Sequence, residues 1–224
     1  MFQPGEDWNP LQARLNGLIK KKDHFEEMQK LLLGMHSLLH SKEVYGGSEN
    51  TFMDELWEGL EDKAFRTMPT SKDDTIAWNI WHITRIEDLT ANFLIVGQEQ
   101  VLDLAWQERL NTKVTDTGNS MTDEEIIAFS KEVSKEGLYE YRKAVGRRTK
   151  EILEGLIPEE LKRKVPKEGI VRIAEVGGVA QHPDAIWLLD FWGKKTVAGI
   201  LQMPITRHQI VHLNASGKLK QRIK

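Results

Sequence analysis

The fold is decided by residues 75–96, TIAWNIWHITRIEDLTANFLIV, whose apolar residues recur at the period of an α-helix. With about 100° of rotation per residue, His82 falls in the middle of one apolar stripe. That stripe is formed by Trp78, Ile86, Leu89 and Phe93. The opposite side carries Thr84, Glu87 and Asp88, which we expect to face solvent. The stretch therefore predicts a long amphipathic helix that ends at Gly97.

Capping and breaking residues predict further helices on both sides of this one. An N-cap pattern opens a helix at Asp23, and a capping box opens another at Thr122. The expected ranges are 23–45, 51–65, 122–153, 183–192 and 196–216, the last with Pro204 as a kink or a fresh start. Residues 170–173 fit either a short strand or a helical turn within an irregular segment. The chain is thus expected to be all-α.

Length and composition favour one domain over the whole chain. With 224 residues and 40% hydrophobic residues, the chain is long enough for one well-filled core. We expect a single helical domain over 1–224, with its core at about 23–219 and an insertion at about 156–183. The chain has no cysteine, which excludes disulfides, thiolate metal ligands and a cysteine nucleophile.

Charge and hydropathy limit the kinds of partner that the protein can have. The net charge is −3, and the Lys and Arg residues are spread along the chain apart from the short tail 218–224, so we expect no nucleic-acid partner. The N-terminus has no signal-peptide pattern, and no apolar run approaches eighteen residues. We therefore expect a cytoplasmic protein without a membrane partner.

The histidines carry the strongest functional signal. His208 and His212 are four residues apart, so they lie one turn apart on the same face of the last helix. Both lie on its inward face, as His82 does on its own helix. Three inward imidazoles without an obvious local carboxylate favour a divalent metal ion with an open position. The alternative is that each is a hydrogen-bonded core residue.

The other histidines are expected to be less important. His36 and His40 form a second pair at the same spacing, but they lie on the flank of their helix. We interpret this pair as a chance occurrence with partly exposed side chains. His24 beside a helix start and His182 before a proline are expected at the surface or in loops.

Three residues of the same helix border His82. Asn79 and Arg85 each lie about 60° from it, so they can hold a substrate anion or carbonyl; the alternative is a helix-flank ion pair or cap. Trp78, like Trp187 and Trp192, is expected to pack in the protein core and to form a wall of the pocket. We therefore take Asn79, Arg85 and Trp78 as candidate substrate-binding residues.

Two motifs together resemble a known family. Residues 76–82, IAWNIWH, near the start of one helix, and residues 206–214, TRHQIVHLN, on a much later one, are similar to the signature of the DinB-like superfamily. The resemblance extends from about His24 to Leu219. It implies a four-helix bundle with an up-down-down-up arrangement and frequent homodimers. It also implies a zinc or nickel ion held by three histidines, which here are His82, His208 and His212.

The resemblance also suggests a reaction class. Members with known activity are transferases or isomerases that use low-molecular-weight thiols such as bacillithiol or mycothiol. The chain is therefore expected to be a metal-dependent S-transferase acting on a small-molecule substrate. Two alternatives stay open: a metal-dependent hydrolase, since a metal ion also lowers the pKa of bound water, and a non-enzymatic, stress-related bundle whose metal is structural or absent.

Overall fold

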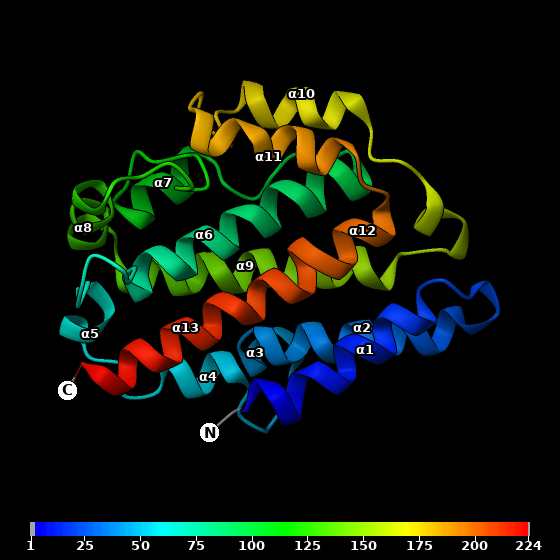
Figure 1. Cartoon of the computed structure of the whole chain (residues 1–224), viewed down its shortest axis with the longest axis horizontal. Coiled ribbons are helices and arrows are strands. Elements are labelled where there is room, and N and C mark those ends of the chain that lie inside the picture. Colours follow the sequence, from blue (N-terminus) through cyan, green and yellow to red (C-terminus); the bar gives the residue numbers. More distant parts are fainter. Residues whose placement is uncertain (1–2, 224) are drawn as a thin grey trace.

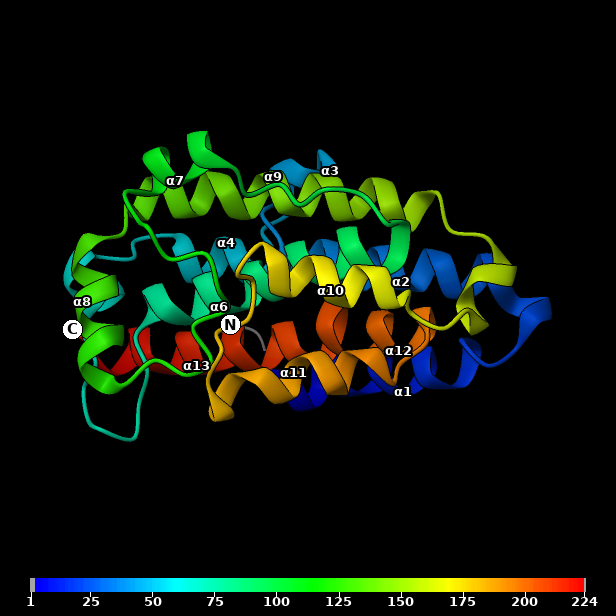
Figure 2. The same ribbon diagram turned by 90° about the horizontal axis from the view of Figure 1, so that it is seen from above.

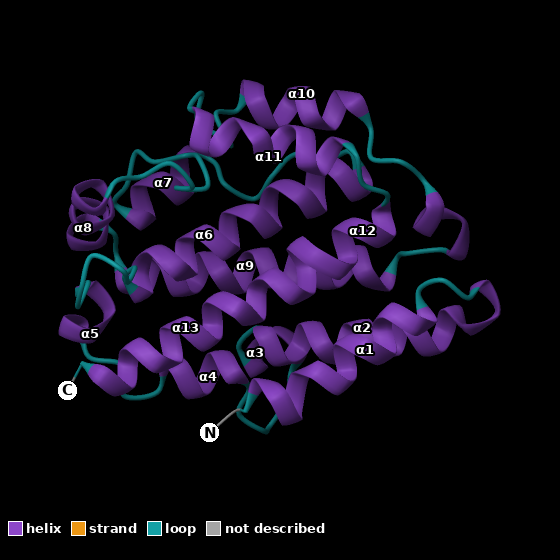
Figure 3. Ribbon diagram, in the orientation of Figure 1, coloured by secondary structure: helices purple, strands orange, loops and turns teal. Residues whose placement is uncertain are grey.

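The computed structural model describes residues 3–223. The expectation of an all-α protein is confirmed, because this part of the chain holds helices and loops but no strand (Figure 3). An isolated antiparallel bridge joins Lys164 to Thr196. Among the described helices, none is both long and apolar enough to cross a membrane. The expected domain 1–224 includes residues 1, 2 and 224, which lie outside the described residues.

The α-helices have the following bounds in chain order: α1 Asn9–Leu18, α2 Phe25–Leu39, α3 Lys42–Tyr45, α4 Phe52–Trp57, α5 Asp62–Arg66, α6 Ile76–Leu89, α7 Leu104–Leu110, α8 Asp123–Glu132, α9 Lys135–Glu154, α10 Lys167–Glu175, α11 Pro183–Gly193, α12 Val197–Gln202 and α13 His208–Arg222. Three π-helical segments are η1 Pro4–Trp8, η3 Thr90–Val96 and η5 Met203–Arg207. Two 3₁₀ segments are η2 Lys22–His24 and η4 Pro158–Lys162.

The long helices α2, α6, α9 and α13 lie side by side (Figures 1 and 2). Helix α6 packs against both α9 and α13, and α2 packs against α9 and, less extensively, α13. In Figure 1, α2 and α13 run from right to left, whereas α6 and α9 run from left to right. Helix α6 therefore shares one core with helices from both ends of the sequence.

Several helix boundaries follow the expected signals. The Thr75 side chain caps α6 by accepting from the backbone N–H of Trp78, and Thr122 forms the expected capping box at α8. Gly97 ends η3, the continuation of α6, in the left-handed conformation with φ 66°. This conformation favours glycine, so the sequence stops the helix where its backbone turns.

Four expected helices are interrupted. The helix expected over 23–45 is divided into α2 and α3. The helix expected over 122–153 breaks at Val133, and Ser134 starts α9 by accepting from the N–H of Gly137. The segment 51–65 forms two short helices, α4 and α5. In the last helix Pro204 lies in η5, between α12 and α13. Proline has no N–H to donate to the preceding turn, so the regular α-helical bonding fails at this point.

The expectation that one side of α6 faces solvent was wrong. Thr84, Glu87 and Asp88 are all fully buried. Helix α9 covers this side and supplies polar partners: Tyr141 donates to Asp88 Oδ2 at 2.6 Å. Helical periodicity locates one apolar stripe, but a helix in the middle of a fold has no free side, and its polar residues are buried in pairs.

The expected insertion is helical rather than irregular. It holds η4 and α10, and residues 170–173 lie within α10, so the helical alternative is confirmed. Helix α10 packs on α11 and η3, along the upper edge of the molecule in Figure 1. After α10 the turn Gly177–Gly178 passes next to the loop 115–118: the Thr117 N–H donates to the Gly178 carbonyl at 3.1 Å.

Candidate metal centre

The structure brings the three predicted histidines together. His82 comes from α6, and His208 and His212 come from α13. Their ring centroids are 4.7 to 5.0 Å apart in all three pairs. One nitrogen of each ring lies within 4.8 Å of the nitrogens of the other two. We call these residues the histidine triad. Such a cluster has the donor set of a three-histidine metal site and could hold a divalent ion.

The His82 ring is held from two directions. Its Nδ1 donates to the Thr117 carbonyl oxygen at 2.7 Å. The Trp78 indole stacks on it with centroids 4.6 Å apart and an interplanar angle of 10°. Since the hydrogen bond places the proton on Nδ1, Nε2 carries the free lone pair. Trp78 thus packs directly on a candidate metal ligand, and its expected role in substrate binding stays a prediction.

Asn79 orients the His212 ring. The His212 Nδ1 donates to Asn79 Oδ1 at 2.6 Å. The Asn79 amide is itself fixed, because its Nδ2 donates to the Thr75 carbonyl at 3.0 Å. The Asn79 side chain is fully buried. The structure therefore gives Asn79 a contact to a triad histidine, of the kind that sets the tautomer and angle of a metal ligand.

His208 has no such partner. No hydrogen bond to its ring is found among residues 3–223, and its buried Nδ1 is left without a partner. A buried polar atom without a partner is costly. A metal ion bound through Nδ1 would relieve this cost, and a divalent ion fits a group of three imidazoles.

The triad histidines are neutral at physiological pH. Burial lowers the pKa of His82 to about 4, although its bond to the Thr117 carbonyl opposes the shift. Burial also lowers the pKa of His212 to about 3, with His82 adding to the effect. The pKa of His208 is well below its ordinary value, because of burial and then its two histidine neighbours. Neutral imidazole is the form that coordinates metal ions.

Four successive carbonyls of loop 115–118 bind side chains of α6. Each accepts one or two hydrogen bonds: Thr115 from Arg85, Asp116 from Trp81, Thr117 from His82 and Gly118 from Trp78. Gly118 has φ 72°, and a Cβ atom there would lie 2.7 Å from the Trp78 indole nitrogen. Only glycine therefore lets the loop approach the wall of the triad so closely.

Arg85 lies in a separate polar group. Its guanidinium is fully buried and donates to Asp88 at 2.9 Å, to Tyr141 at 2.9 Å and to Gln100 at 2.9 Å, besides the Thr115 carbonyl. No bond joins it to a triad histidine in the described chain. The structure thus matches the ion-pair alternative for Arg85. Of the other tryptophans, Trp192 is buried, whereas Trp187 is 49% exposed.

The chain matches a known protein family over most of its length. The model of the DinB superfamily matches residues 52–215, from α4 into α13, and this range contains the whole triad. The chain belongs to the DinB superfamily. A comparison with curated proteins finds no match. The DinB-superfamily match thus covers about three quarters of the chain but leaves α2 outside.

Helix α2 contributes a second group of potential metal ligands to this DinB-superfamily protein. His36, His40 and Glu87 also converge. His36 Nε2 lies 2.8 Å from Glu87 Oε1, and His40 Nε2 lies 3.1 Å from both carboxylate oxygens. We call these residues the core cluster. The expectation of partly exposed histidines was wrong, since both are fully buried. Their partner is remote in sequence, so helix periodicity could not reveal it.

The core cluster is already balanced in charge. Arg142 Nη1 lies 3.3 Å from Glu87 Oε2, in a fully buried ion pair. His36 Nδ1 also bonds the Tyr45 hydroxyl at 2.7 Å. Burial, and then the Arg142 charge, lower the pKa of His40 to about 3, so this residue is neutral. With one carboxylate and one guanidinium, the cluster is electrically satisfied without a metal ion.

Proposed function

We propose that this protein binds one divalent metal ion at the histidine triad and uses it as a low-molecular-weight-thiol S-transferase acting on a small-molecule substrate. The convergence of His82, His208 and His212 carries the metal-binding part. The thiol-transfer part rests on membership of the DinB superfamily and on the chemistry of an open three-histidine site.

Accessibility favours the triad over the core cluster as the metal site. His208 and His212 are only partly buried, so the triad is less completely enclosed by protein than the core cluster. The core cluster is sealed, and its three side chains are fully buried. A divalent ion added to Glu87 and Arg142 would leave a net charge of about +2 in a dry interior, at a cost of several kcal/mol.

The residues around the triad suit a nucleophile supplied from outside. The chain has no cysteine, so the thiol must be a co-substrate. When bound, a divalent ion with three imidazole ligands supplies Lewis acidity and lowers the pKa of a thiol or water that joins it. Thr117 and Asn79 hold two rings in place, and Trp78 provides an apolar wall.

In the proposed transfer, the thiol loses its proton to solvent and its sulfur forms a bond to an electrophilic carbon of the substrate. The bond between that carbon and the displaced group breaks, and its electron pair leaves with the displaced group. A hydrolase would use water instead of the thiol at the same site. A non-enzymatic protein would keep the ion without turnover.

Metal content tests the first part. Protein purified without a histidine tag is measured by elemental mass spectrometry, as wild type, His208→Ala and the exposed-histidine control His182→Ala. We expect about one zinc or nickel ion per chain in wild type and control, and a loss in His208→Ala. The absence of metal from wild type, even after incubation with zinc or nickel, would overturn the proposal.

Thiol consumption tests the second part. Metal-loaded protein is mixed with bacillithiol or mycothiol and a set of alkyl and epoxide electrophiles, and the free thiol is followed over time. We expect consumption above background with wild type but not with His212→Ala. If water rather than thiol attacks ester or amide substrates, the hydrolase alternative replaces the transferase. If neither reaction occurs, the non-enzymatic alternative stands.

A further inference from the structure

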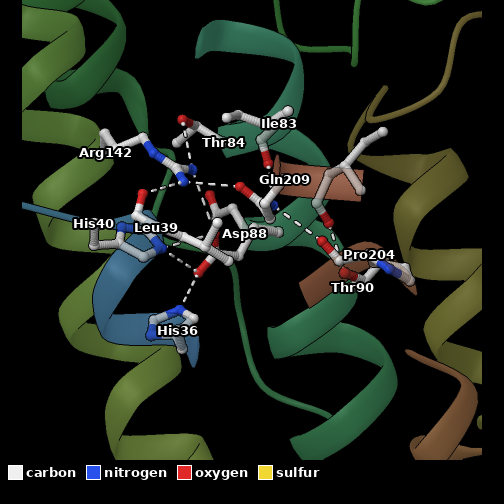
Figure 4. Close-up of polar contacts among 12 residues, drawn as sticks. His36, Leu39, His40, Ile83, Thr84, Asp88, Thr90, Arg142, Pro204 and Gln209 are labelled. Carbon is white, nitrogen blue, oxygen red and sulfur yellow. Dashed lines mark hydrogen bonds and ion pairs between the residues drawn. The ribbon is translucent and has the colours of Figure 1, made fainter. Parts of the chain in front are cut away.

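Gln209 sits between the two triad histidines in the sequence of α13, but its side chain belongs to the core. It is fully buried. Its amide nitrogen donates to the carbonyls of Ile83 at 3.1 Å and Pro204 at 3.0 Å, and its amide oxygen accepts from Arg142 at 2.8 Å. Both amide hydrogens and the oxygen are thus engaged, as Figure 4 shows. Such an amide has one orientation only.

The bond from Gln209 to Ile83 joins the two helices that carry the triad. Ile83 directly follows His82 on α6, and Gln209 directly follows His208 on α13. One hydrogen bond therefore links positions that are each one residue from a triad histidine. Because a helix rises about 1.5 Å per residue, this bond fixes how far α13 is shifted along α6.

The bond from Gln209 to Pro204 fixes the turn before the histidines. In η5 the His208 N–H bonds the Met203 carbonyl, five residues back, rather than that of Pro204. The Pro204 carbonyl thereby loses its α-helical donor, and the Gln209 amide takes that place. This π turn sets the rotation at which α13 begins, and such turns are frequent at functional sites.

Arg142 holds the amide oxygen of Gln209 and anchors it to the core cluster. Its second terminal nitrogen, Nη2, also donates to the Leu39 carbonyl at 3.0 Å, and Nη1 pairs with Glu87. These contacts bring together α2, α6, α9 and α13 around one guanidinium (Figure 4). The side chains that surround Gln209 are therefore fixed by all four long helices.

We propose that Gln209 is a positioning residue of the metal centre. Its amide, oriented by Arg142, fixes the shift and rotation of α13 against α6, so that His208 and His212 face His82. This inference rests on the proposed function, since it assumes a metal ion at the triad. Gln209 does not touch the ion. It acts by fixing the position of the α13 backbone, which carries His208 and His212, against α6.

The test compares metal affinity among three forms of the whole protein. Gln209→Met has a similar volume but makes none of the three hydrogen bonds. Gln202→Met is the matched control: Gln202 precedes the same π turn and makes one side-chain bond, to Asn16 on α1. Zinc and cobalt dissociation constants are measured by chelator competition, together with the visible absorption of the cobalt form and the melting temperature of the metal-free protein.

We expect Gln209→Met to weaken metal binding by about 10- to 100-fold, the range found when partners of metal ligands are removed. We also expect an altered cobalt spectrum, and a change within about two-fold in Gln202→Met. A lower melting temperature with unchanged metal affinity and spectrum would assign Gln209 a purely structural role and overturn the inference.

If Gln209→Met does not fold, Gln209→Asn replaces it. This variant keeps an amide but is one methylene too short to reach all three partners, so we expect a smaller loss of affinity in the same direction. Wild-type affinity in Gln209→Asn would count against the inference. If wild type itself binds no metal, the proposed function fails and the inference fails with it, a result distinct from a variant that binds as wild type does.

Discussion

Asn79 Oδ1 accepts a hydrogen bond from His212 Nδ1 across 2.6 Å, so a side chain of α6 sets the orientation of a ring on α13. The amide cannot turn away, because its nitrogen is held by the Thr75 carbonyl. The pair resembles the partner contacts that metal-ligating histidines make through their second nitrogen. A ring of the candidate metal site is thus oriented by a residue that is not itself a candidate ligand.

The first prediction concerns this pair. We expect Asn79→Leu to weaken metal binding by about 10- to 100-fold, because the His212 ring loses its acceptor. Asn79→Asp keeps an acceptor and should bind metal nearly as wild type does. Chelator competition measures both. Asn119→Leu serves as control, since the Asn119 side chain bonds the Asp184 carbonyl rather than a triad histidine. Equal affinity in Asn79→Leu and Asn79→Asp would contradict the assignment.

The second prediction separates the triad from the core cluster. Because Arg142 already balances Glu87, a divalent ion in the core cluster would be strongly disfavoured. We expect His36→Gln to keep about one metal ion per chain and to lower the melting temperature, and His208→Gln to lose the ion. Elemental analysis with thermal unfolding checks both. Two metal ions per chain in wild type, with one lost in His36→Gln, would show that the core cluster binds metal.

The third prediction concerns stability in acid. A histidine in an unfolded chain titrates near pH 6.5, whereas burial and the charge of Arg142 lower the pKa of His40 to about 3. Between these values the unfolded chain holds more protons at His40 than the folded one does. The contribution of neutral His40 is therefore complete above about pH 6.5 and is lost as the pH falls towards 3.

This dependence is checked by urea unfolding of metal-free protein between pH 4 and 7. The groups that face His40 are His36 and Glu87, together with Arg142. In His40→Gln the decline of the unfolding free energy with falling pH should be shallower by up to one proton, while the overall stability is lower. A slope identical to that of wild type would mean that His40 titrates alike in both states.

The sequence located the triad because helix periodicity places His82, His208 and His212 on inward faces, and burial of ionisable groups then calls for a partner. The same reasoning wrongly placed Glu87 on a side that faces solvent. Periodicity describes one helix at a time, and Glu87 is satisfied by His36 and His40, about fifty residues earlier. A salt bridge between distant helices leaves no local pattern.

The role of loop 115–118 could not be predicted either. Its contacts to α6 are made by backbone carbonyls, which every residue has. The sequence marks this loop only by Gly118, because a backbone with positive φ favours glycine. Asn79 lies three residues before His82 on α6, but its partner His212 lies on the other helix of the pair. A pattern within one helix cannot reveal this contact, and a role of Asn79 in substrate binding stays a prediction.

The fourth prediction tests that loop. Gly118→Ala places a Cβ atom 2.7 Å from the Trp78 indole nitrogen and holds alanine at φ 72°. We expect a loss of about 1–3 kcal/mol in the free energy of unfolding and weaker metal binding, because the Thr117 carbonyl shifts away from His82. In the control Gly217→Ala, on α13, nothing lies within 4 Å of the added Cβ. It should stabilise the protein by about 0.5–1 kcal/mol. Similar effects in both variants would contradict this account.

The burial of α6 on every side also bears on how the molecule opens. Helices in contact with solvent can fray or detach locally, and their amide hydrogens then exchange with deuterium without loss of the remaining structure. Every residue from Ile76 to Leu89 is buried, so α6 cannot detach without losing its contacts to both α9 and α13. Its amides should exchange only when the whole protein unfolds. The part of the chain that holds His82 is then expected to be the slowest-exchanging part, so that one of the three triad positions stays fixed for as long as the protein is folded.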